Sequence, residues 1–264
     1  MKARSQLVLL LALSILSVTV RAEQPLPAAT AAYNNALSQL EARLAQQRRS
    51  TANYLSVLDS AQQKARLHQG QPVIEQLSSG AELPGALLHH WRGTAFVPGA
   101  HAAEFERLLR DFPSYPHIYA PQVLSARILS QSTTHTQAMM RVRQKHILTV
   151  VLDTTYDVAF THLDAAHGAS VSHGTHITEI ADAGSSKEHA LSAADQQGFL
   201  WRIDTYWSWA EQDGGLYLQI ESVTLTRGIP SGLGWAIGPF VQSIPRESLE
   251  FTLRSTAAAL TRRN

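Results

Sequence analysis

Hydrophobic and polar positions alternate over residues 199–227, and this alternation predicts two β-strands joined by a tight turn. Asp213 and Gly214 stand between the two alternating runs, and this residue pair favours a two-residue turn with positive φ at both positions. The register that follows pairs Trp209 with Leu218, Trp207 with Ile220, Thr205 with Ser222, and Ile203 with Thr224.

The two faces of this predicted hairpin differ in character, because successive side chains of a strand point to opposite faces. The apolar face carries Trp201, Ile203, Trp207, Trp209, Leu218 and Ile220. The opposite face is polar and carries Arg202, Asp204, Tyr206, Gln219 and Glu221. A cavity beside the hairpin would therefore meet one of the two sets and not both.

The same pattern predicts a sheet of seven strands and a short helix between the first two. The strands are expected at 87–97, 123–130, 134–145, 147–162, 169–181, 199–211 and 215–227. Residues 101–110 have helical spacing, and the prolines in 111–123 allow only short helical turns.

A long C-terminal helix is expected from about 245 to 262. Leu249, Leu253, Thr256 and Leu260 form one stripe at helical spacing. Ser243 is suited to cap this helix, and Pro245 and Glu247 are suited to its first turn. Because an antiparallel sheet needs a cover for its inner face, we expect this helix to lie across the sheet.

The N-terminal region is predicted to be a helical extension. Residues 23–30 are expected to be flexible, and 31–67 show helical spacing that Arg48–Thr51 can break into two helices. Residues 70–85 form a connector rich in Pro and Gly. The extension is expected to pack on the main domain or on a partner protein.

The first 22 residues have the pattern of a secretory signal peptide. Lys2 and Arg4 precede an apolar run, and Val20-Arg21-Ala22 fits a cleavage site. The run is shorter than the about 20 residues that a transmembrane helix needs. We therefore expect cleavage after Ala22 and a periplasmic or secreted protein, with a retained membrane anchor as the alternative.

Composition narrows the chemistry further. The 264-residue chain has no Cys, which excludes disulfides, thiolate metal sites and Cys nucleophiles. Without residues 1–22 its net charge is slightly negative, and no basic stripe suggests nucleic acid. Neighbouring His residues, His89-His90 and the pair His173 and His176, fall on opposite strand faces, so no metal or other cofactor is expected.

The order of elements, with DFPSYPHIYAPQVLSARIL at 111–129, resembles the START-like (SRPBCC) superfamily. That superfamily includes coenzyme Q-binding proteins, polyketide cyclases and lipid-transfer domains, and residues 199–253 are also similar to secreted bacterial members of unknown role. The resemblance covers about residues 86–262 and implies a helix-grip fold. In this α+β fold, a seven-stranded antiparallel sheet wraps around the C-terminal helix and leaves an apolar cavity between them.

Three parts are therefore expected. The N-terminal pattern predicts a signal peptide at 1–22, helical spacing predicts an extension with connector at 23–85, and the resemblance implies a START-like domain at 86–264. Its binding site is expected between the last helix and the sheet. The candidate ligand-binding residues are Arg202, Tyr206, Glu221, Trp201, Trp207, Trp209, Tyr115, Tyr119 and Trp235. The polar set among them would more commonly face solvent. The alternative, which we favour in part, is that it lines the cavity and fixes a polar head group.

Three functions fit these expectations. The first is binding, sequestration or transfer of a lipid, isoprenoid or polyketide-like molecule, with transient membrane contact. The second is a cyclase/aromatase-like enzyme in which Arg202, Tyr206 and Glu221 are acid–base groups. The third is an interaction module with a filled cavity, which docks a protein partner through the N-terminal helices. No nucleophile motif accompanies the polar set, so a carrier is favoured over an enzyme.

Overall fold

The computed structural model describes residues 24–56, 60–78, 82–145, 149–229 and 234–262, and the side chains of residue 82 and residues 234–242 are not described. The proposed signal peptide and its cleavage site lie outside these residues. The helices are α1 (Pro27–Gln47), α2 (Ala61–His68), α3 (Ala102–Arg110), α4 (Tyr115–Ile118) and α5 (Gly234–Thr261), with a 3₁₀ turn at Phe112–Ser114. The strands are β1 (Val73–Gln76), β2 (Glu82–Leu83), β3 (Ala86–Pro98), β4 (Val123–Gln131), β5 (His135–Lys145), β6 (Thr149–His162), β7 (His167–Ala181), β8 (His189–Ala190), β9 (Arg202–Gln212) and β10 (Gly215–Arg227).

One antiparallel sheet organises the molecule, in the order β1-β3-β10-β9-β7-β6-β5-β4. The seven strands predicted from alternation are β3, β4, β5, β6, β7, β9 and β10. The connector adds β1 and β2, which both pair with β3, and the β7–β9 connection adds β8. The predicted α+β helix-grip architecture is therefore confirmed, with a sheet that is one full strand wider because residues 73–76 extend its edge.

The β9–β10 hairpin has the predicted turn and register. Asp213 and Gly214 have φ values of 56° and 75°, as a two-residue turn of this type requires. All four predicted pairs are present: Trp209 with Leu218, Trp207 with Ile220, Thr205 with Ser222, and Ile203 with Thr224. The pleat therefore separates the Trp-bearing face from the face that bears Glu221.

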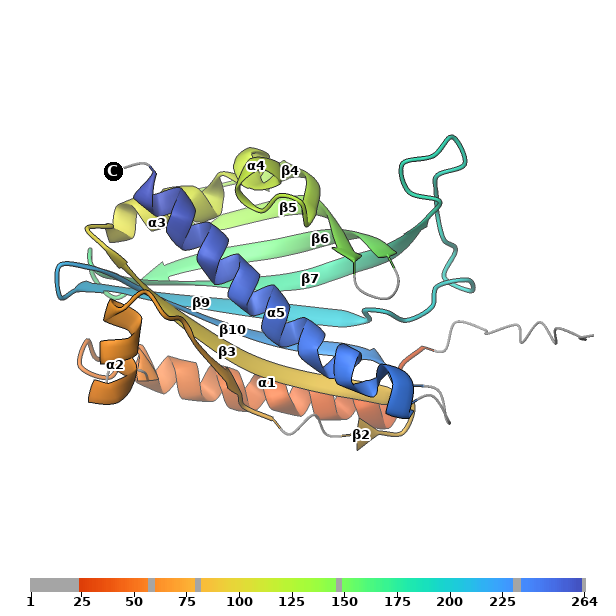
Figure 1. The fold of residues 1–264 in the computed structure, drawn as a ribbon, viewed down its shortest axis with the longest axis horizontal. Coiled ribbons are helices and arrows are strands. Elements are labelled where there is room, and N and C mark those ends of the chain that lie inside the picture. The colour runs from red at the N-terminus through yellow and green to blue at the C-terminus, as the bar shows by residue number, and fades with distance from the viewer. Residues whose placement is uncertain (1–23, 57–59, 79–81, 146–148, 230–233, 263–264) are drawn as a thin grey trace, which may run out of the picture.

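Helix α5 lies across the concave face of the sheet (Figure 1), where most of its contacts are with β3. Its predicted stripe, Leu249, Leu253, Thr256 and Leu260, is buried. The predicted start was wrong, because the helix begins at Gly234 and continues through Ser243 and Pro245. Pro245 therefore stands inside the helix, where it removes one backbone hydrogen bond, and Ser243 is not its cap.

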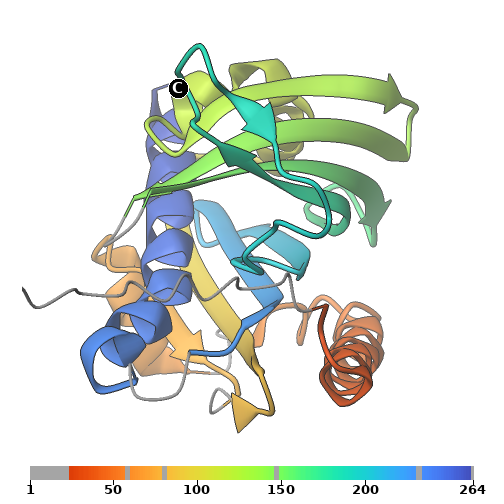
Figure 2. The same cartoon turned by 90° about the vertical axis from the view of Figure 1, so that its right-hand side faces the viewer.

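Helices α1 and α2 cover the other side of the sheet. Figure 2 shows α1 and α5 on opposite sides of the layer formed by β3, β9 and β10. α1 buries Ala29, Tyr33, Leu40 and Leu44 against Leu88, Val223 and Leu225 of the sheet. The expected flexible start was too long, since the helix begins at Pro27, and its end at Gln47 agrees with the predicted break at Arg48. The extension thus packs on the main domain.

Candidate functional site

A cavity of about 700 Å³ lies between α5 and the concave face of the sheet. Its wall comes from α5, from the segment around α4, and from strands on both halves of the sheet. Phe199, in the loop before β9, is part of this wall and is also 42% exposed. The cavity therefore reaches solvent there. The volume is within the range of about 300–1,000 Å³ that is typical of small-molecule sites.

Most of the cavity wall is apolar. Trp207 and Ile220 pair across the β9–β10 ladder and supply the middle of the sheet-side wall. Opposite the sheet, α5 contributes Leu249 and Phe251. Further apolar side chains in the wall are Trp91, Leu109, Phe112, Val123, Met140, Val142, Val150, Leu152, Val158, Leu200, Ile203, Ile229 and Ile244.

Tyr115 and Tyr119, two of the predicted site residues, also lie in the cavity wall. The Tyr115 hydroxyl donates to the carbonyl of Leu109 (2.8 Å), and the Tyr119 hydroxyl is 3.0 Å from the hydroxyl of Thr256 on α5. Burial raises the pKa of Tyr119 to about 12 and also raises that of Tyr115 well above its ordinary value, so both hydroxyls stay neutral. With their hydroxyls already bonded, these rings offer mainly apolar surface.

The cavity wall also holds uncharged polar side chains that the sequence analysis did not select. Ser170 and Ser172 on β7, Thr205 on β9 and Ser222 on β10 are among them, together with His89 on β3. Burial lowers the pKa of His89 below the ordinary imidazole value, which favours the neutral ring. Strand alternation predicts that His89 and His90 point to opposite faces of the sheet. The same alternation could have placed His89 on the face of the sheet that carries Trp207.

The other predicted Trp residues do not line the cavity. Trp209 shares a face with Trp207 but lies beyond the cavity, 1% exposed and edge-to-face with Phe105 of α3. Trp201 precedes β9 and packs against the apolar cluster on the α1 side. Their assignment to the cavity is thus corrected. Trp201 lies outside the strand, where strand parity does not apply, and α3 covers the end of β9 that carries Trp209. The side chain of Trp235 lies outside the described residues.

Arg202, Tyr206 and Glu221 lie on the face of the sheet opposite the cavity. Tyr206 and Glu221 are 3% and 1% exposed, so they face neither solvent nor the cavity. For Tyr206 and Glu221, both placements predicted from the sequence are therefore corrected, whereas Arg202 is exposed, in agreement with the solvent placement. The physical reason is that α1 covers this face, which the hairpin pattern alone cannot indicate.

Tyr206 and Glu221 instead belong to a buried network with α1. The Tyr206 hydroxyl donates to Glu41 (2.7 Å), and Arg43 forms an ion pair with Glu221 (2.5 Å). His90 Nε2 lies 3.1 Å from the same Glu221 oxygen. Burial raises the pKa of Glu221, but the hydrogen bond with His90 and the charge of Arg43 outweigh it, and the pKa is lowered.

A second centre of this network is Asp204 on β9. Its carboxylate accepts a hydrogen bond from the Tyr33 hydroxyl of α1 and is bonded to His173 of β7. The hydrogen bond with Asp204 raises the pKa of His173, in spite of an opposing effect of burial. Arg202 lies with its guanidinium 5.3 Å from the centre of the Tyr33 ring. The polar face of the hairpin thus fastens α1 to the sheet.

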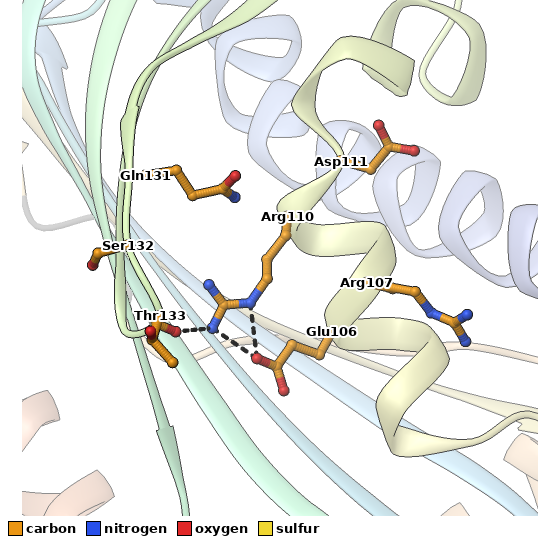
Figure 3. A pocket seen from close by; sticks show the side chains of 7 residues that line it. All are labelled: Glu106, Arg107, Arg110, Asp111, Gln131, Ser132 and Thr133. Atoms are coloured by element: carbon orange, nitrogen blue, oxygen red, sulfur yellow. Dashed lines mark hydrogen bonds and ion pairs between the residues drawn. The ribbon is translucent and has the colours of Figure 1, made fainter.

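A second hollow lies between α3 and the β4–β5 turn, and it is lined by polar and charged side chains (Figure 3). Arg110 donates to Glu106 of the same helix (2.8 Å) and to the Thr133 carbonyl of the β4–β5 turn (2.8 Å). Its guanidinium also lies 3.8 Å from the centre of the Phe160 ring. These contacts join α3 to the sheet and engage both Arg110 and Glu106, so the apolar cavity is the stronger candidate site.

The described part of the chain offers neither a metal-binding cluster nor a membrane-spanning helix. No three His, Asp or Glu side chains within it are close enough to hold a metal ion together. Within the same residues, no helix combines the length and apolar character that crossing a membrane requires.

Comparison with known proteins finds similarity in structure only. No protein-family model and no curated protein matches the chain. A STAR-related lipid transfer protein from Xanthomonas axonopodis is 16% identical, with a TM-score of 0.46 over 71% of this chain and 98% of that one. A START superfamily protein from Mycobacterium smegmatis is 14% identical, with a TM-score of 0.44 over 66% and 99% of the two chains.

An aromatase/cyclase from Streptomyces is 14% identical, with a TM-score of 0.42 over 67% of this chain and 95% of that one. The similar structures thus include START proteins and an aromatase/cyclase, the groups to which the sequence resemblance points. At these identities and TM-scores, the similarity does not extend to a ligand or a reaction.

Proposed function

We propose that this protein binds a hydrophobic or amphipathic small molecule in the cavity between α5 and the sheet, for sequestration or transfer. The observation that carries the proposal is the cavity of about 700 Å³ with a predominantly apolar wall. Such a wall favours an acyl, polyprenyl or polyketide-like ligand, because burial of apolar surface contributes about 25 cal/mol per Å².

The cyclase-like alternative has less support in the geometry. The three residues considered as acid–base groups, Arg202, Tyr206 and Glu221, are on the α1 side of the sheet. Among the described residues of the cavity wall there is no Asp or Glu. The interaction-module alternative is also less favoured, because the apolar faces of α1 and α2 already pack on the sheet.

We expect Trp207→Ala to weaken binding of a long-chain fluorescent probe by about tenfold or more, since a buried aromatic contact is worth about 1.5–3 kcal/mol. Trp207 is 7% exposed and lies in the middle of the cavity wall. Equilibrium titration with a fluorescent fatty-acyl probe measures the change. Tyr206→Phe is the matched control, because residue 206 is adjacent on β9 but faces α1.

Two results would count against the proposed function. One is the absence of saturable probe binding to the unaltered protein. The other is an equal loss of affinity in Trp207→Ala and Tyr206→Phe, which would indicate a general effect on folding. Thermal melting of each variant in parallel separates a local effect on the cavity from a loss of stability.

We also propose that the protein is exported and acts in the periplasm or outside the cell. The charged start, the apolar run and the small residue at Ala22 support this location. The expected mature N-terminus is Glu23. N-terminal sequencing of the protein recovered from the periplasm checks it, and an intact Met1 in a membrane fraction would favour a retained anchor.

A further inference from the structure

The cavity wall has a polar strip that crosses the three neighbouring strands β7, β9 and β10 and ends beside Trp91 of β3. Ser172 of β7 pairs with Thr205 of β9, Thr205 pairs with Ser222 of β10, and Ser222 pairs with Trp91 of β3. All four residues belong to the wall. Directly paired residues of an antiparallel sheet have Cβ atoms about 4.5–5.5 Å apart, so these hydroxyls form a continuous row.

His89 and Thr224 lie beside this row. They pair with each other across the β3–β10 ladder, and both face the cavity. Thr224 is two residues from Ser222 on the same strand, about 7 Å along it. His89 is 4% exposed, and its ring has no hydrogen-bond partner among the described residues. The imidazole, with one donor and one acceptor, is thus left unused at the cavity wall.

We propose that His89, Thr224 and Ser222 form a subsite for one neutral oxygen group, a hydroxyl or a carbonyl, of an otherwise apolar ligand. This subsite rests on the proposed function, because it has a role only if the cavity binds a ligand. Buried polar groups in proteins are nearly always hydrogen-bonded, and leaving one without a partner costs about 1–3 kcal/mol. A ligand oxygen placed at His89 can supply the missing partner.

The charges around the subsite exclude an anionic head group from it. Among the described residues of the wall, Arg227 is the one Arg or Lys, and its guanidinium is directed to the Gln197 carbonyl at 3.4 Å. Arg227 lies three residues beyond Thr224, about 10 Å along β10. A carboxylate or phosphate buried at His89 would lack a cation, and such burial is costly.

The experiment compares three C12 compounds that displace a bound fluorescent probe: dodecan-1-ol, dodecan-2-one and n-dodecane. We expect the alcohol and the ketone to bind more tightly than the hydrocarbon to the unaltered protein. In His89→Leu this preference should fall by about fivefold, which corresponds to the loss of one neutral hydrogen bond. Affinity for n-dodecane should not fall.

His176→Leu is the matched control, because His176 is exposed and its ring contacts Thr178 on β7. If His89→Leu does not fold, Thr224→Val and Ser222→Ala test the same preference with smaller changes. An unaltered preference in all folded variants, or equal affinity of the alcohol and the hydrocarbon for the unaltered protein, would overturn the subsite alone. A failure of every C12 compound and of the probe to bind would overturn the proposed function as well.

Discussion

Trp209→Ala is expected to lower the free energy of unfolding by about 3–5 kcal/mol, the usual cost of removing a large aromatic side chain from a core. Trp209 is 1% exposed and packs edge-to-face on Phe105, with 5.3 Å between ring centres. The ring also lies directly over Gly168, where an added Cβ would come within 2.2 Å of it. Such close packing leaves little room for neighbours to fill the space.

Urea denaturation at constant pH measures this loss. Trp209→Phe, which retains a ring, should recover a large part of the stability. Probe affinity of the folded fraction should stay close to that of the unaltered protein, because Trp209 is not part of the cavity wall. A loss of binding without a loss of stability would contradict this division between Trp209 and Trp207.

The second large effect is expected at the α1 interface, where Arg43→Met should lower the free energy of unfolding by about 3 kcal/mol. The change removes the closest cation of the Glu221 carboxylate, whose side chain is 2% exposed, and among the described residues leaves only His90 at 3.1 Å and Arg92 at 4.0 Å. Removing one partner of a buried ion pair costs about 3–5 kcal/mol, and the partial exposure of Arg43 favours the lower end. Adding Glu221→Leu should restore much of the loss, since no buried charge then remains unpaired.

The same carboxylate makes the stability of the protein sensitive to acid. The folded-state pKa of Glu221 is lower than its ordinary value of about 4.3, so its contribution is complete above that value. The contribution is lost as the pH falls through the lowered pKa. Denaturation between pH 7 and pH 3 should therefore show a smaller decline for Glu221→Gln than for the unaltered protein. Parallel declines would contradict the assignment.

The local sequence pattern was sufficient for most of the sheet. Alternation gave seven strands within a few residues, and Asp213-Gly214 gave the hairpin register, because a two-residue turn leaves a single way to pair the strands. The stripe of Leu249, Leu253, Thr256 and Leu260 correctly predicted which face of α5 is buried. Its start was missed because Pro245 resembles an N-terminal residue, while the packed helix tolerates it inside.

The candidate site was predicted less completely, because it depends on contacts between distant segments. Glu221 contacts α1 and not solvent or the cavity. Its ion-pair partner Arg43 on α1 is far away in the chain. Likewise, Ser172, Thr205 and Ser222 form a row only once β7, β9 and β10 are in register. Trp207 and Tyr119 could be predicted, because aromatic residues in a sheet and in a short helical turn are conspicuous in the sequence itself.

The pairing of β3 with β10 has a consequence for how the chain folds. It joins Ala86–Pro98 to Gly215–Arg227, so this pair of strands can form only after nearly the whole domain has been synthesised. Contacts of such long separation carry a high loop-closure entropy and slow the folding rate. In the interval, β1 and β2 can pair with β3 locally and protect one of its edges. The cavity itself can form only in a nascent chain that already includes α5.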